Sequence, residues 1–325
     1  MRVGLVGAGL MARTHARGWR RCPGALVAVY APDAGAGTLA AEHGLRLCGS
    51  LDELLREVDA VDLCTPTPTH RELTLSCAAA GRHVICEKPI ALSPEDARAM
   101  IRGCQEAGVR LFIAQVVRFF PQYLEAWRRV QAGEIGEPRV LRLRRVGSPP
   151  APGSWYHDEA QSGGVATDLM IHDLDYARWV AGEVSEVYAR QARQGERVLV
   201  QATLLHLGGA ISFVEGGWAA PAGVFRTSLD LAGTAGVVEW SSDAAPPLRR
   251  WGAAPQAAPQ TASGSDALPS ADDAPYADQL EHAYWALLSG QPFRVTPEDA
   301  LAALELSLAV RASLVQGRPQ PVGSP

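Results

Sequence analysis

The sequence has no asparagine and only one lysine, Lys88, although 30 of its 325 residues are basic. The other 29 basic residues are all arginine, which we interpret as a coding bias toward Ala, Gly, Pro and Arg. Against this bias, the single lysine becomes a candidate for a specific role. The 35 acidic residues give a formal net charge of −5, so the chain lacks the basic surplus that is typical of nucleic-acid-binding proteins.

Long apolar runs and paired cysteines are also missing. No segment approaches 18 consecutive apolar residues, so we expect no transmembrane helix and no membrane partner. The first apolar run is too short for an export signal. The six cysteines form no C-x-x-C pair and their spacing fits no zinc site, so we expect no metal. Reduced, buried thiols are typical of a cytoplasmic protein, which is the location we expect.

A length of 325 residues suggests about two domains. Over residues 1–118, short apolar runs alternate with helical patterns, which is typical of α/β proteins with a doubly wound parallel sheet. The expected strands are Arg2–Val6, Leu26–Tyr30, Ala60–Thr65, His83–Cys86 and Arg110–Val116. The expected helices are Leu10–Arg21, Ala34–His43, Leu51–Glu57, His70–Ala80 and Pro94–Ala107.

Residues 119–325 follow a different pattern. The expected strands are Arg139–Val146, Glu186–Gln191, Leu199–Leu207, Ala210–Trp218, Arg226–Ala232 and Gly236–Trp240. Because no helices intervene, we expect an open, mostly antiparallel sheet in an α+β domain. Helical patterns cover 123–131, 165–181, 277–288 and 297–316. The Ala-, Pro- and Ser-rich stretch 241–275 is expected to be a flexible loop, apart from a short strand near Leu248–Trp251.

A glycine-rich motif follows the first expected strand. It reads Gly7-Ala8-Gly9-Leu10-Met11-Ala12 and fits the G-x-G-x-x-A pattern. In that pattern the first glycine allows a tight turn, the second lets a pyrophosphate approach the backbone, and the small last residue allows close helix–strand packing. The following helix N-terminus offers N–H groups to the phosphates. We therefore predict a dinucleotide-binding Rossmann domain over residues 1–118.

The end of the second strand indicates the type of dinucleotide. Ala31 follows this strand directly and Asp33 comes two residues later, whereas no Arg or Lys occurs between Ala31 and Leu45. A cofactor with a 2′-phosphate usually has a cation there, so NAD is favoured over NADP. Asp33 is a candidate ribose contact, and the alternative is a turn residue after Pro32.

Three further motifs carry candidate site residues. Two of them follow strands, where open α/β sheets bind ligands: Thr65-Pro66-Thr67-Pro68-Thr69-His70 and Glu87-Lys88-Pro89. The third contains Asp168 and His172. On a single helix over 165–181, Asp168 and His172 are four residues apart and share one face, an arrangement suited to proton transfer.

Together these motifs resemble the Gfo/Idh/MocA family, the oxidoreductases of glucose–fructose oxidoreductase and inositol dehydrogenase type. The resemblance covers nearly the whole chain and includes Arg118-Phe119, the stretch from Trp179 to Gly182, and the turn at 233–236. Two positions depart from the family pattern, because Thr67 stands where asparagine is frequent and Ala31 stands where an acidic residue is expected.

The resemblance implies an NAD(P)-dependent dehydrogenase that acts on a CH–OH group of a sugar, inositol or related polyol. It assigns Lys88, Asp168 and His172 to catalysis. Lys88 would hydrogen-bond the reacting hydroxyl and the cofactor ribose. His172 would take the hydroxyl proton, and Asp168 would position substrate hydroxyls and tune His172.

The predicted contacts extend beyond these three residues. The cofactor set is Gly7, Gly9, Leu10, Met11, Ala12, Asp33, Thr65, Pro66, His70, Glu87 and Lys88. The substrate set is Lys88, Arg118, Trp155, Asp168 and His172. Each weaker candidate has a structural alternative: helix capping for His70, bracing of the domain junction for Arg118, and plain packing for Trp155. His15, on the first helix, is expected to be exposed or to pair locally.

Residues 119–325 are expected to bind the substrate and to form a homodimer or homotetramer through the exposed sheet face. Two other functions stay open. One is a dehydrogenase of a non-sugar substrate such as a dihydrodiol, and the other is a sensor that binds a dinucleotide without turnover.

Overall fold

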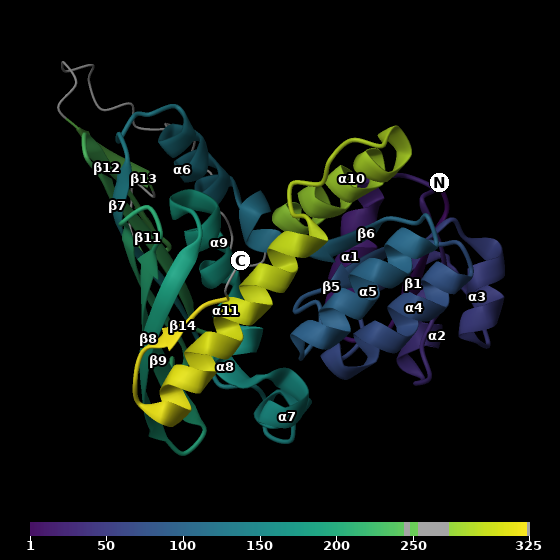
Figure 1. The fold of residues 1–325 in the computed structure, drawn as a ribbon. Coiled ribbons are helices and arrows are strands. Elements are labelled where there is room, and N and C mark those ends of the chain that lie inside the picture. Colours follow the sequence, from purple (N-terminus) through teal and green to yellow (C-terminus); the bar gives the residue numbers. More distant parts are fainter. Residues whose placement is uncertain (244–247, 253–272, 324–325) are drawn as a thin grey trace. The chain divides into compact units, whose positions relative to one another are not determined.

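The structure, a computed structural model, describes residues 1–243, 248–252 and 273–323 (Figure 1). The chain divides into two compact units, one formed by residues 1–119 with 273–304 and the other by 120–272 with 305–325. The segment 273–304 therefore groups with the N-terminal unit, although sequence patterning assigned everything after residue 118 to a second domain. Most of the predicted loop at 241–275 lies outside the described residues.

The first unit contains a parallel six-stranded sheet in the order β3-β2-β1-β4-β5-β6. Its strands are β1 (Val3–Val6), β2 (Leu26–Tyr30), β3 (Arg46–Leu47), β4 (Ala60–Leu63), β5 (His83–Glu87) and β6 (Leu111–Ala114). The order reverses at β1, which confirms the doubly wound sheet predicted from the alternating pattern. Strand β3 was not predicted, because its two residues are both exposed and form no apolar run.

The helices of this unit are α1 (Leu10–Gly18), η1 (Trp19–Arg21), α2 (Gly35–His43), α3 (Leu51–Glu57), η2 (Thr67–Thr69), α4 (His70–Ala79), α5 (Pro94–Glu106), η3 (Val116–Phe119) and α10 (Ala274–Ser289). Figure 1 shows α4 and α5 side by side. Helix α5 starts at Pro94, as predicted, and the Ser93 hydroxyl caps it by accepting the Asp96 amide N–H at 3.1 Å. Leu280 of α10 packs into the same apolar cluster as Val3, Ile85 and Phe112.

The second unit contains an eight-stranded sheet in the order β13-β12-β11-β7-β10-β9-β8-β14. Its strands are β7 (Pro138–Gly147), β8 (Val184–Gln194), β9 (Arg197–His206), β10 (Ile211–Trp218), β11 (Phe225–Gly233), β12 (Gly236–Ser241), β13 (Leu248–Gly252) and β14 (Gln320–Pro321). Strands β7 and β10 are parallel and the other neighbours are antiparallel. The mostly antiparallel sheet predicted from the sequence is confirmed.

The remaining helices are α6 (Pro121–Gln131), η4 (Trp155–His157), α7 (Glu159–Ser162), α8 (Gly164–Asp168), α9 (Ile171–Ala181) and α11 (Pro297–Gln316). Helix α11 has the predicted bounds, and the division between the two units falls inside it, after residue 304. Within the described residues, no helix combines the length and the apolarity that crossing a membrane requires.

The single helix predicted over 165–181 is interrupted. The Met170 amide donates to the Val165 carbonyl five residues earlier, at 2.9 Å, so the regular i−4 pattern is lost at this point. Asp168 ends one helix and His172 lies in the first turn of the next. The prediction that these two residues share a face of one continuous helix is therefore wrong.

A buried ion pair joins α9 to the sheet of the second unit. The Arg145 guanidinium on β7 donates to both oxygens of Asp173 on α9, at 2.7 and 3.2 Å. Both side chains are at most 5% exposed. Burial raises the pKa of Asp173, and the guanidinium opposes that shift. The pair fixes the helix that carries His172, and removing one partner would strand the other charge in the interior.

Asp173→Ala should therefore destabilise the protein by about 3–5 kcal/mol, because Arg145 would stay buried without a counter-charge. The matched control is Asp230→Ala, which breaks the exposed Arg142–Asp230 pair of the same sheet and should cost less than about 1 kcal/mol. Urea unfolding followed by circular dichroism measures both changes. Equal losses for the two variants would contradict a structural role for the buried pair.

Candidate functional site

The glycine-rich motif forms the turn between β1 and α1. Gly7 has φ = +117°, and a Cβ there would lie 2.4 Å from the Cys64 carbonyl oxygen. The turn is therefore closed to any side chain at this position. Ala12 is fully buried and packs with Leu5 and Val29 beneath the turn, as the fingerprint predicts.

Gly9, at the start of α1, differs from Gly7 because the space around it is open. A Cβ on Gly9 would meet no atom within 4 Å, so this glycine is not required by packing within the protein. The helix has no side-chain N-cap, which leaves its first amides without a capping acceptor. Leu10 is 77% exposed beside it. Open space over an uncapped helix N-terminus fits the pyrophosphate of a dinucleotide.

Asp33, the predicted ribose contact, lies in the turn after β2. Its carboxylate accepts the Gly35 amide at 2.7 Å. This bond holds the turn before α2, which matches the structural alternative given for Asp33. No cation follows β2 before Leu45 in the sequence, so nothing there favours a 2′-phosphate.

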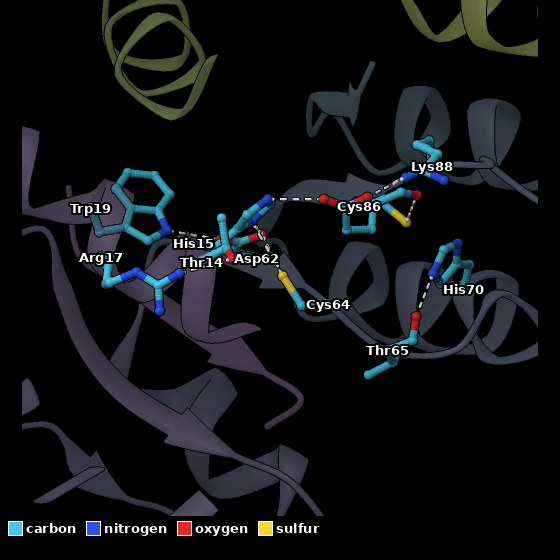
Figure 2. A network of polar contacts seen from close by, with 11 residues as sticks. Thr14, His15, Arg17, Trp19, Asp62, Cys64, Thr65, His70, Cys86 and Lys88 are labelled. Atoms are coloured by element: carbon cyan, nitrogen blue, oxygen red, sulfur yellow. Dashed lines mark hydrogen bonds and ion pairs between the residues drawn. The ribbon is translucent and has the colours of Figure 1, made fainter. Parts of the chain in front are cut away.

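His70 connects the loops that follow β4 and β5. It is fully buried, with Nδ1 2.9 Å from the Pro89 carbonyl oxygen and Nε2 3.0 Å from the Thr65 carbonyl oxygen. Figure 2 shows its ring directed toward Thr65. These contacts support a bracing role, because the ring joins the T-P-x-x-x-H loop to the E-K-P turn. Thr65 is half-buried and Pro66 is exposed.

The E-K-P turn follows β5. Glu87 is 6% exposed, and its Oε2 accepts the backbone N–H of Lys88 at 3.0 Å. The Lys88–Pro89 peptide bond is cis, and the Lys88 side chain is half-buried. The only lysine of the chain therefore lies at the carboxyl end of β5, next to the neighbouring loop that contains Thr65.

A buried polar cluster lies behind this turn (Figure 2). His15 of α1 has Nδ1 3.0 Å from both oxygens of Asp62 on β4. The same carboxylate accepts the Trp19 indole N–H at 2.7 Å and the Cys64 thiol at 3.6 Å. On the other side, His15 Nε2 lies 2.9 Å from Oε1 of Glu87.

Ionisation in this cluster follows from burial and charge. Burial alone lowers the pKa of His15, but the contacts with Asp62 and Cys64 together more than offset it, and the pKa lies well above its ordinary value of 6.5. Burial raises the pKa of the Cys64 thiol, which therefore stays protonated at neutral pH. The ring of His15 is then an imidazolium between two carboxylates.

The cluster also groups three side chains of metal-ligating types, His15, Asp62 and Cys64, with ligand atoms within 4.8 Å of one another. Cysteine and histidine spacing in the sequence did not predict this group. The His15–Asp62 separation of 3.0 Å is that of a hydrogen bond, and the Trp19 N–H already donates to the carboxylate. The contacts are therefore hydrogen bonds to Asp62 and an ion-pair contact, without hydrogen-bond geometry, between His15 Nε2 and Glu87.

The expectation that His15 is exposed or pairs locally is wrong. His15 is fully buried, and its partners come from β4 and β5. Two signals in the sequence pointed to this. His15 shares its helix face with Ala12, Ala16 and Trp19, and Asp62 interrupts the apolar run of a central strand.

The other candidates are distributed over both units. Arg118 is 2% exposed and donates to the Asp299 carboxylate and to the Arg294 carbonyl oxygen, each at 3.1 Å. Both partners belong to the first unit, so these contacts are internal to it, and the predicted role of Arg118 at the domain junction stays a prediction. Trp155 and Tyr156 stack on each other at 4.2 Å between ring centroids, and both are half-buried. Asp168 and His172 are half-buried as well.

Comparison with known proteins places this fold. Residues 1–115 match the oxidoreductase family with an NAD-binding Rossmann fold, and residues 123–239 match the Gfo/Idh/MocA C-terminal domain. The inositol 2-dehydrogenase of Rubrobacter xylanophilus is 31% identical over an alignment covering 98% of this chain and 92% of that protein. The chain belongs to the Gfo/Idh/MocA family. This confirms the resemblance inferred from the motifs.

One further relative is similar to this chain in sequence, and one solved structure is similar to it in fold. The myo-inositol 2-dehydrogenase of Thermotoga maritima is 41% identical over 133 residues, 41% of this chain. That alignment spans 39% of the relative, so this chain covers about two fifths of its length. The crystal structure of a probable dehydrogenase from Thermotoga maritima superposes with a TM-score of 0.84 at 26% identity, covering 99% of each chain.

Substitution of the two glycines of the family fingerprint should have opposite effects on stability and on NADH binding. Gly9→Ala should leave the stability nearly unchanged, because its Cβ meets no protein atom, yet should weaken NADH binding about tenfold or more by filling the space of the pyrophosphate. Gly7→Ala should destabilise the protein by about 1–3 kcal/mol through backbone strain and the Cys64 clash. Thermal unfolding and NADH fluorescence titration measure the two effects. A Gly9→Ala protein that binds NADH normally would exclude this site.

Proposed function

We propose that this protein is an NAD-dependent dehydrogenase that transfers a hydride between nicotinamide and a carbinol carbon of a sugar, inositol or related polyol. The observation that carries the proposal is the open space at Gly9, over an uncapped helix, in a chain of the Gfo/Idh/MocA family. The description of the family as NAD-binding and the missing cation after β2 support NAD over NADP.

The proposed roles are divided between two parts of the sequence. Residues 1–118 bind the dinucleotide, and residues 119–325 bind the substrate and form the oligomer. When bound, the nicotinamide accepts the hydride of the substrate C–H bond. The protein supplies the remaining chemistry, which is to orient the hydroxyl, remove its proton and stabilise the oxygen as the C=O bond forms.

Lys88 is proposed to act on the substrate oxygen. Its ammonium presents three donors on a flexible stem, which suits a developing alkoxide better than the broad guanidinium fork of arginine. All 29 other basic residues of the chain are arginine, whereas lysine stands at position 88, at the end of β5. This exception in composition supports a role for which lysine is better suited than arginine.

His172 is proposed to take the hydroxyl proton as the hydride leaves, and Asp168 to hold substrate hydroxyls. A histidine titrates near neutral pH, which suits reversible proton transfer. The break between α8 and α9 supports this assignment, because both residues lie at helix ends beside an irregular turn, and such interruptions of helices are frequent at functional sites.

The oligomer and the location are further parts of the proposal. Leu205 on β9 and Phe225 on β11 are 39% and 57% exposed, and the exposure of these apolar side chains supports a homodimer or homotetramer in which a second copy covers them. All six cysteines are free and buried, which supports a reducing, cytoplasmic environment.

Lys88→Ala and His172→Ala should each lower the turnover number by about 10²-fold or more, since each removes a proposed donor or proton acceptor. The control is Arg102→Ala, on an exposed position of α5, which should keep wild-type turnover. Steady-state NADH formation with a panel of inositols, sugars and a dihydrodiol measures all three. Near-normal turnover in both test variants would refute the assigned roles. NADH binding without turnover across the panel would indicate the dinucleotide sensor instead.

Cofactor choice gives a separate prediction. NADH should bind about tenfold or more tightly than NADPH, because the turn after β2 offers no cation to a 2′-phosphate. Ala31→Arg should reduce this preference. Fluorescence titration with both nucleotides measures it, and equal affinities for wild type would contradict the NAD assignment.

A further inference from the structure

A continuous chain of buried charges runs from the helix of the fingerprint to the E-K-P turn (Figure 2). It starts at Asp62, passes through His15 and ends at Glu87. His15 and Asp62 are fully buried, and Glu87 is 6% exposed. Three elements that are separated in sequence supply the residues: β4, α1 and β5.

The two ends of the chain have different surroundings. Asp62 receives three kinds of donor, from His15, the Trp19 indole and the Cys64 thiol. Glu87 has His15 at Oε1 and the Lys88 backbone N–H at Oε2. One oxygen of the Glu87 carboxylate therefore accepts the backbone N–H of the next residue, and the other lies beside the His15 ring.

This geometry makes the position of Lys88 depend on His15. A buried carboxylate needs a positive partner, and His15 is the cation whose ring contacts Glu87. If that partner is removed, Glu87 must turn toward water or take up a proton. Either change weakens its bond to the Lys88 amide, which is the first link to the Lys88 side chain.

We propose that His15 is a positioning residue, which holds the Glu87 carboxylate against the Lys88 backbone and so fixes the place of the Lys88 ammonium. This inference rests on the proposed function for its effect on turnover. Its structural part, the coupling of His15 to the Lys88 backbone, is independent of any activity.

The unusual composition allows a direct test of that structural part. Growth on [α-¹⁵N]lysine labels a single backbone amide, because Lys88 is the only lysine. This amide is the group that donates to Glu87. In the full-length wild-type protein, its ¹H–¹⁵N resonance should be single and protected from solvent exchange.

The test variant is His15→Gln, and the matched control is His43→Gln, a half-buried histidine in the last turn of α2. His15→Gln should shift the Lys88 amide resonance and increase its exchange rate about tenfold or more, as expected for a weakened hydrogen bond. His43→Gln should leave both unchanged. A Lys88 resonance in folded His15→Gln that coincides with wild type would overturn the proposal.

Kinetics test the functional part. His15→Gln should lower kcat about 10- to 100-fold, as a displaced catalytic group does, while the NADH dissociation constant stays within about twofold. Loss of NADH affinity with unchanged kcat would show that His15 serves the cofactor instead. If no polyol is turned over by wild type, the proposed function fails, whereas the amide measurement still decides the coupling of His15 to Lys88.

A second variant covers the case in which His15→Gln does not fold. Glu87→Gln keeps the size of the side chain and an oxygen for the Lys88 amide but removes the charge that His15 pairs with. It should shift the same amide resonance and lower kcat. In the double variant the two effects should not add, because both residues act through one link. Full additivity of the two changes would contradict the proposed chain.

Discussion

A carboxylate in the interior needs a partner of opposite charge, and Glu87 is such a carboxylate at the end of a central strand. The imidazolium of His15 meets this requirement for Glu87 and for Asp62 at the same time. Because α1 follows the fingerprint turn directly, one helix both begins at the proposed dinucleotide site and supplies the cation that contacts Glu87.

The parallel sheet explains why such distant segments meet. Strands β1, β4 and β5 are adjacent, and their carboxyl ends share one edge. The carboxyl ends of these strands bring together Gly7, Cys64 and Glu87, although 80 positions separate the first from the last. His70 then joins the two outer loops through carbonyl oxygens of Thr65 and Pro89. The charged contacts of His15 and the contacts of the His70 ring therefore both stabilise this edge of the sheet.

Local patterns in the sequence predicted much of the fold and of the cofactor loop. Periodicity predicted most strands of both sheets, and the helical pattern predicted the start of α5. Both signals are contained in a few neighbouring residues. The helix break at Met170 was not predictable in this way, since no glycine or proline marks it. The His15 cluster was missed because its members are brought together only by tertiary packing. Strand β3 was missed because two exposed residues carry no pattern.

The first unit is discontinuous along the chain, since α10 joins it only after the residues of most of the second unit. Leu280 and Ala283 of α10 complete the apolar cluster around Val3 and Phe112. A ribosome therefore releases the whole six-stranded sheet long before the helix that covers this cluster is made. During synthesis, the apolar surface that awaits α10 is a natural binding surface for chaperones. Folding of the dinucleotide-binding unit is completed only when nearly all of the protein has been translated.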